Sequence, residues 1–207
     1  SLREQNEKNK NSDGVAPLPI YEEGQSLTAL KVVPSAGIDP VTGQEIFIKR
    51  DGTYTFVYDS NDKVIFGDTN PYGTGSLNSY LTYKRFALSC TFQYSFGGSL
   101  YNETLATKVE GSNPKYNADE RVLNDRWKTP GTVAKYKRID DTTTPYQTSR
   151  FVEKNNFLRM SSLSLSYEVP TTFIQMYGLK RMFLELLTND LFYLSTAKRE
   201  RGLNYPY

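Results

Sequence analysis

The sequence has 207 residues, lacks histidine altogether and contains a single cysteine. Without histidine the chain cannot form a Ser-His-Asp triad or use an imidazole as a general acid or base. Without histidine and a second cysteine it also lacks the ligand sets of the usual zinc centres. These absences favour a protein that is not an enzyme, and we expect no metal site and no cofactor.

An excess of charge of one sign and long apolar runs are also missing. The 25 basic residues nearly balance the 23 acidic ones, which gives a net charge of +2. A chain this close to neutral has no strong field to steer it onto nucleic acid, so we expect no nucleic-acid partner. No apolar run approaches the roughly 18 residues that a spanning helix needs, which excludes a helical membrane protein.

What the chain does contain is a strictly alternating segment between Ser76 and Phe96. A period of two places every second side chain on the same face of a strand. The segment therefore predicts two strands that share one apolar face and are joined by a short turn at Lys84 and Arg85. In the second strand the apolar face carries Phe86, Leu88, Cys90, Phe92, Tyr94 and Phe96.

Alternation of this kind occurs both in soluble sandwiches and in transmembrane barrels. A transmembrane strand needs about 9 to 11 residues, apolar toward lipid and polar toward the lumen, with aromatic side chains near its ends. Phe86, Tyr94 and Phe96 lie where such an aromatic girdle belongs. The barrel is the preferred interpretation. A soluble, aromatic-rich carbohydrate-binding β-sandwich is the first alternative, and a secreted glycosidase domain is the second.

Long polar segments lie on either side of this hairpin. Residues 1–75 are rich in turn residues, and within them Glu45–Arg50 and Thr53–Tyr58 are expected to pair across an Asp51-Gly52 turn. Residues 97–156 form a second polar stretch of about sixty residues, and a loop of that length counts against a compact soluble domain.

A second alternating hairpin is expected over residues 157–188, with a first strand that ends at Pro170 because proline has no N–H to donate to a ladder. One helical turn is expected in the connector that follows, and residues 189–207 begin another loop. The competing interpretation is a single helix over Thr172–Leu187, which Gly178 in its middle disfavours.

Short and long connections then alternate along the chain. Short periplasmic turns and long extracellular loops are typical of outer-membrane barrels. Residues 1–75 and 97–156 are therefore expected to lie outside the cell, while residues 76–96 and 157–188 form barrel wall.

Several motifs follow one another in an order and spacing typical of one family. They are Gly37-Ile38-Asp39-Pro40-Val41-Thr42-Gly43, Arg50-Asp51-Gly52, Asn70-Pro71, Tyr83-Lys84-Arg85-Phe86, Asp125-Arg126-Trp127 with Pro130-Gly131, the strand from Asn156 to Tyr167, and Leu187-Thr188-Asn189-Asp190-Leu191. Through these the chain resembles the C-terminal part of the SusC/RagA-like, TonB-dependent outer-membrane transporters of Bacteroidota. The resemblance covers nearly the whole chain, and within the family it is closest to the starch-system transporter.

The resemblance implies an all-β fold, a segment of an antiparallel transmembrane barrel of about 22 strands with long extracellular loops. A plug domain and a final strand would lie outside residues 1–207. It implies import of starch-derived oligosaccharides across the bacterial outer membrane, driven by the TonB–ExbB–ExbD complex acting on the plug region. It also implies a SusD-like surface lipoprotein as partner and maltooligosaccharide or another glycan as cargo.

Aromatic side chains in the long polar segment are the candidate substrate-binding residues. An aromatic ring can stack on the apolar face of a sugar, and Trp127 is the single tryptophan. The competing and favoured interpretation is that Trp127 packs its loop against itself or against a partner. The same two interpretations apply to Tyr101, Tyr116, Tyr136 and Tyr146. No residue is assigned a catalytic role.

Overall fold

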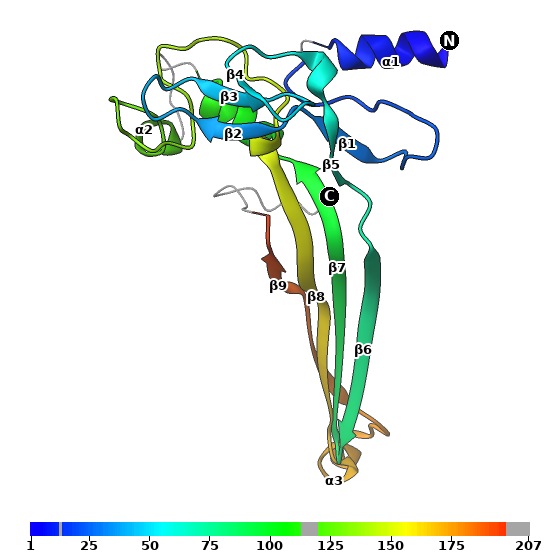
Figure 1. The fold of residues 1–207 in the computed structure, drawn as a ribbon. Coiled ribbons are helices and arrows are strands. Elements are labelled where there is room, and N and C mark those ends of the chain that lie inside the picture. Colours follow the sequence, from blue (N-terminus) through cyan, green and yellow to red (C-terminus); the bar gives the residue numbers. More distant parts are fainter. Residues whose placement is uncertain (13, 113–119, 198–207) are drawn as a thin grey trace. The chain divides into compact units, whose positions relative to one another are not determined.

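Figure 1 shows the fold in a computed structural model, which describes residues 1–12, 14–112 and 120–197. The chain divides into two units. The loop unit comprises residues 1–70 and 99–153, and the sheet unit comprises residues 71–98 and the described residues from 154 onward.

The sheet unit contains one four-stranded sheet whose strands are neighbours in chain order. β6 and β7 pair antiparallel up to Tyr83↔Phe86, so Lys84 and Arg85 alone form the turn, as predicted. Lys84 closes this turn with a φ of 54°, in the left-handed region. The strands are β6 (Gly73–Tyr83), β7 (Phe86–Tyr101), β8 (Val152–Glu168) and β9 (Phe183–Ser195).

The register of β6 and β7 separates apolar from polar side chains. Residues directly opposite each other in an antiparallel ladder point to the same side of the sheet. One side carries the pairs Leu77↔Phe92, Ser79↔Cys90, Leu81↔Leu88 and Tyr83↔Phe86. The other side is mostly polar and carries the pairs Thr74↔Ser95, Ser76↔Gln93, Asn78↔Thr91, Tyr80↔Ser89 and Thr82↔Ala87. We call these sides the apolar face and the polar face.

Ring contacts continue the apolar face into the other two strands. The ring centroids of Phe86 and Tyr167, in β8, are 4.7 Å apart. Those of Phe92 and Phe192, in β9, are 6.2 Å apart. On the polar face, Arg159 of β8 donates a hydrogen bond to Gln93 of β7. The apolar face therefore continues into β8 and β9, and the polar face continues into β8.

Two glycines of β6 make room for aromatic rings of β7. Gly73 is paired with Phe96, and Gly75 is paired with Tyr94. A Cβ atom would lie 2.6 Å from the Phe96 ring at Gly73 and 2.5 Å from the Tyr94 hydroxyl at Gly75. The two rings therefore lie against the β6 backbone, and the ladder begins at Gly73 rather than at Ser76.

β8 and β9 form the second hairpin, and both strands extend beyond residues 157–188. The ladder continues through Asp190 instead of ending at the polar pair Asn189-Asp190. Asp190 takes a φ of 51°, and the register shifts between Met160 and Ser162. Such a bulge absorbs an extra residue without ending a strand.

The connector between β8 and β9 contains α3 (Thr171–Ile174) and the 3₁₀ turn η4 (Gln175–Tyr177). Gly178 follows with a φ of 71° and ends this helical segment, so the competing helix over Thr172–Leu187 is wrong. α3 and the β6–β7 turn lie at the same end of the sheet (Figure 1), where Glu168 N–H donates to the Arg85 carbonyl at 2.9 Å.

No second sheet covers the apolar face within the described residues of the sheet unit. Leu77 is 61% exposed, Leu81 60% and Leu186 68%. A sandwich would bury such side chains between two facing sheets, so the sandwich alternative is not supported. Across the described residues, no helix has the length and apolarity to span a membrane.

The loop unit is built from short elements joined by turns. β1 pairs with β5, and β2, β3 and β4 form a second small sheet. The predicted hairpin across Asp51-Gly52 is confirmed, with strands shorter than expected. The elements are α1 (Leu2–Lys10), β1 (Ala29–Val32), β2 (Ser35–Ile38), β3 (Glu45–Ile48), β4 (Tyr54–Thr55), η1 (Ser60–Asp62), β5 (Val64–Asp68), the π-helix η2 (Leu105–Glu110), α2 (Arg121–Asn124) and η3 (Ser149–Phe151).

Arg150 of η3 links three segments of the loop unit. Its guanidinium donates to both carboxylate oxygens of Glu45 in β3, at 2.8 and 2.7 Å. It also donates to both oxygens of Glu110 in η2, at 2.8 and 2.6 Å. Burial would lower the pKa of Arg150, but the two carboxylates outweigh that effect and raise it. Arg150 is the cation of both ion pairs, so its loss would leave two buried carboxylates close together.

Candidate functional site

Trp127 lies in a loop that backbone hydrogen bonds close after α2. The Trp127 N–H donates to the Tyr136 carbonyl at 3.1 Å, and the Lys135 N–H donates to the Asp125 carbonyl at 2.9 Å. Arg126 and Tyr136 also form an isolated bridge. These bonds fix the position of Trp127 although the loop contains no regular strand.

The indole of Trp127 docks on a second loop, the turn from Asp39 to Gly43. Its Nε1–H donates to the Pro40 carbonyl at 2.8 Å. A Cβ atom at Gly43 would lie 2.6 Å from the indole, so this close approach requires glycine. Asp39 holds the turn by accepting from the Thr42 hydroxyl at 2.6 Å, and that hydrogen bond lowers the pKa of Asp39. The indole N–H is thus occupied by a hydrogen bond to Pro40, and the ring packs against Gly43.

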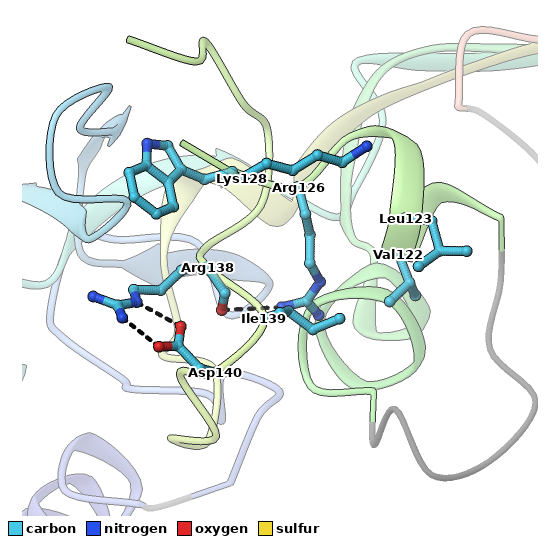
Figure 2. A pocket seen from close by; sticks show the side chains of 8 residues that line it. Val122, Leu123, Arg126, Lys128, Arg138, Ile139 and Asp140 are labelled. Atoms are coloured by element: carbon cyan, nitrogen blue, oxygen red, sulfur yellow. Dashed lines mark hydrogen bonds and ion pairs between the residues drawn. The ribbon is translucent and has the colours of Figure 1, made fainter. Parts of the chain in front are cut away.

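Trp127 also borders a hollow of about 430 Å³ (Figure 2). Its volume falls within the range of small-molecule sites. Val122 and Leu123 of α2 lie on one side in Figure 2, and the Arg138–Asp140 pair lies on the other. The remaining lining side chains are Arg126, Lys128 and Ile139.

Arg138 and Asp140 neutralise each other at the edge of the hollow. The guanidinium donates to both carboxylate oxygens. This hydrogen bonding lowers the pKa of Asp140 and raises that of Arg138. The guanidinium carbon also lies 5.9 Å from the centroid of the Trp127 ring, which is within the range of a cation–π contact.

Arg126 carries a buried charge beside this pair. It is 3% exposed, and its guanidinium donates to the carbonyls of Val109 at 2.7 Å and Lys137 at 3.3 Å. Burial lowers its pKa, but an arginine side chain stays protonated in proteins. No carboxylate among the described residues forms an ion pair with Arg126.

The tyrosines predicted as candidates lie in different environments. Tyr146 is 37% exposed and stacks on Tyr58, with ring centroids 4.4 Å apart and an interplanar angle of 11°. Tyr101 donates its hydroxyl to the Tyr146 carbonyl at 3.5 Å. Tyr136 is buried in the core of the loop unit, where burial raises its pKa. Tyr116 lies outside the described residues.

Sequence reasoning missed Tyr58, Arg126 and Arg138. Tyr58 ends a predicted strand, and nothing in the sequence pairs it with Tyr146. The two arginines could have been noticed because a guanidinium near a lone tryptophan is a recurrent contact. In the described part of the chain, no group of three or more carboxylate, cysteine or histidine side chains could hold a metal ion.

Comparison with known proteins places these observations in a family context. No protein-family model matches the chain. The chain is 31% identical to TonB-dependent receptor P3 of Formosa agariphila over 162 aligned residues. The aligned region covers 76% of this chain and 15% of that protein. The fold matches a chain of the RagAB peptide transporter with a TM-score of 0.68 and 20% identity, over 82% of this chain and 19% of that one.

The fold is that of part of a TonB-dependent receptor β-barrel. The expected fold class, antiparallel strands of a β-barrel, is therefore confirmed. The RagAB peptide importer in its closed-closed state gives a TM-score of 0.65 with 22% identity, over 79% of this chain and 19% of that one. The chain thus spans less than a fifth of the length of each of these relatives.

Proposed function

We propose that this chain is part of an outer-membrane transporter that imports oligosaccharides. The TonB–ExbB–ExbD complex would drive transport through a plug domain, and a SusD-like lipoprotein would capture the glycan at the cell surface. The chain performs no catalysis in this scheme. Starch-derived oligosaccharides are the first candidate cargo because of the sequence motifs. Peptides are the second, because the similar solved structures are of a peptide transporter.

The single observation that supports this proposal best is the exposed apolar face of the sheet unit. Leu184, Leu186 and Leu194 of β9 are each more than half exposed, as are Leu77 and Leu81 of β6. In water such a face would favour aggregation. In a barrel wall the same face meets lipid, and the polar face meets the lumen.

The loop unit is proposed to lie outside the cell, where it would meet cargo and the lipoprotein. Trp127 at the hollow and the Tyr58–Tyr146 stack are the proposed contact points for sugar rings. Trp127 and Tyr58 are half-buried, and Tyr146 is exposed. Tyr101 is proposed to support the stack through its hydrogen bond to Tyr146. Tyr136 lies in the core and is proposed to act through the position of the Trp127 loop.

Fractionation of cells and uptake of labelled sugar test this proposal together. The full-length receptor is expected in the outer-membrane fraction, released only by detergent. Deleting its gene is expected to abolish uptake of labelled oligosaccharide, and restoring the gene is expected to recover it. Receptor found in the soluble fraction without detergent, or unchanged oligosaccharide uptake in the deletion strain, would show that the proposal is wrong.

A further inference from the structure

We propose that the polar face of the sheet unit carries a subsite for a neutral oligosaccharide. The subsite is formed by Arg159, Asp190 and the paired rings of Phe157 and Tyr193. This inference rests on the proposed import of oligosaccharides and adds a cargo site on the strands themselves. The aromatic contact points proposed above lie in the loop unit, whereas this subsite belongs to the barrel wall.

The strand register brings these side chains together on one side of the sheet. Tyr193 of β9 lies directly opposite Arg159 of β8, and such partners point to the same side. Phe157 precedes Arg159 by two residues and shares that side. Its ring stacks on the Tyr193 ring, with centroids 5.4 Å apart and an interplanar angle of 19°. The hydrogen bond from Arg159 to Gln93 identifies this side as the polar face.

A bulge brings Asp190 to the same place. The register shifts between Met160 and Ser162, and Asp190 takes a φ of 51°. Bulges re-aim side chains and are frequent beside functional sites. The Asp190 carboxylate lies 3.6 Å from Arg159 Nε, and the Asp190 side chain is 61% exposed. A carboxylate is thus presented on the polar face beside a guanidinium and two aromatic rings.

Arg159 and Asp190 keep hydrogen-bonding capacity for a ligand. Their separation of 3.6 Å is longer than a hydrogen bond. In the part of the chain that the structure describes, the guanidinium makes one hydrogen bond, to Gln93, although it carries five N–H groups. A hydroxyl group both donates and accepts. Neighbouring hydroxyls of a sugar can therefore accept from Arg159 and donate to Asp190.

The same arrangement favours a neutral sugar over a charged ligand or a peptide. The charges of Arg159 and Asp190 oppose each other, so an anion would meet the carboxylate and a cation would meet the guanidinium. Phe157 and Tyr193 are half-buried, which leaves part of each ring accessible to the apolar face of a sugar. A short peptide also donates and accepts hydrogen bonds, but its flexible chain offers the rings no such flat face.

Calorimetry with the purified full-length receptor tests the inference, with maltotriose, mannotriose and trialanine as probes. At least one of the two sugars is expected to bind more tightly than trialanine, with an affinity that changes little with salt. Asp190→Asn removes the charged acceptor but keeps a residue type that tolerates a positive φ. This variant is expected to bind the sugar about tenfold more weakly. Phe157→Leu is expected to bind it about fivefold more weakly.

Glu185→Gln is the matched control for Asp190→Asn. Glu185 lies further along β9, opposite Ser166, and accepts a hydrogen bond from the Ser164 hydroxyl on the polar face. Its replacement removes one carboxylate from the same strand and the same face, away from the rings. The control receptor should bind the sugar normally.

Three results would overturn the inference. They are tighter binding of trialanine than of either sugar, no measurable binding of either sugar, and equal sugar affinity of the Asp190→Asn and Glu185→Gln receptors. In the last case, faster hydrogen exchange in the plug domain of the Asp190→Asn receptor would identify the plug as the partner of Asp190.

Each of these results would leave oligosaccharide import standing if uptake still depends on the receptor. Sugar binding that requires Asp190, combined with unchanged uptake in the deletion strain, would instead refute the import proposal alone.

Discussion

The Arg150→Met variant is expected to lose about 3 to 5 kcal/mol of stability in the loop unit. Among the described residues, the change removes the cation that forms ion pairs with both Glu45 and Glu110, whose side chains are 2% and 0% exposed. Two buried carboxylates of like charge would then lose the cation that they share. Hydrogen exchange of the full-length receptor would measure the loss as faster exchange in β3, η2 and η3.

Two further variants separate charge from packing. Arg138→Met breaks the exposed pair with Asp140 and is expected to leave exchange nearly unchanged, because exposed ion pairs contribute little. Combining Arg150→Met with Glu45→Leu and Glu110→Met removes all three charges and is expected to restore most of the protection. Protection that survives Arg150→Met alone would show that the three charges do not hold the loop unit together.

The Leu77→Arg variant is expected to destabilise the folded receptor in lipid vesicles by about 2 to 4 kcal/mol. If the sheet is barrel wall as proposed, the new charge would point into lipid near mid-strand. Leu77 lies opposite Phe92 on the apolar face, in the middle part of β6. The effect would be measured as a lower urea midpoint for unfolding from the vesicles.

Asn78→Arg is the matched control for Leu77→Arg. Asn78 is the next residue of the same strand and lies on the polar face opposite Thr91. At nearly the same depth, its arginine would point into the aqueous lumen and is expected to change the midpoint little. Equal losses at both positions would mean that the two faces of the sheet do not differ in environment.

The two hairpins of the sheet unit could be predicted because alternation is written directly into their sequences. The residues at which the strands begin and end could not be predicted in the same way. Gly73 and Gly75 read as turn residues, and only the register shows that they seat Phe96 and Tyr94. Asp190 likewise reads as a loop residue, but it takes a left-handed conformation within a ladder that continues on both sides.

The candidate site was less predictable, because it depends on contacts between distant loops. The sequence singled out Trp127, but not the turn ending at Gly43 on which its indole rests. Arg126 donates to carbonyls of two other segments, at Val109 and Lys137, and no local pattern in the sequence indicates these contacts. Tyr136 and Tyr146 are both tyrosines of the same long polar segment, so the sequence does not distinguish them. In the structure Tyr136 is buried in the core and Tyr146 is 37% exposed.

Whether the apolar face meets lipid can be measured most directly at Cys90, the single cysteine of the chain, which lies on that face in β7. A spin label would be attached there in the full-length receptor in lipid vesicles, with any other cysteines replaced. A second label would be attached at Thr91→Cys in a Cys90→Ser background, because Thr91 lies on the polar face.

Collisions of each label with oxygen, which concentrates in lipid, would be compared with collisions with a water-soluble nickel complex. If the sheet is barrel wall, the label at Cys90 collides mainly with oxygen and the label at residue 91 mainly with nickel. The same pattern at both positions, or the reverse pattern, would contradict a lipid-facing apolar face.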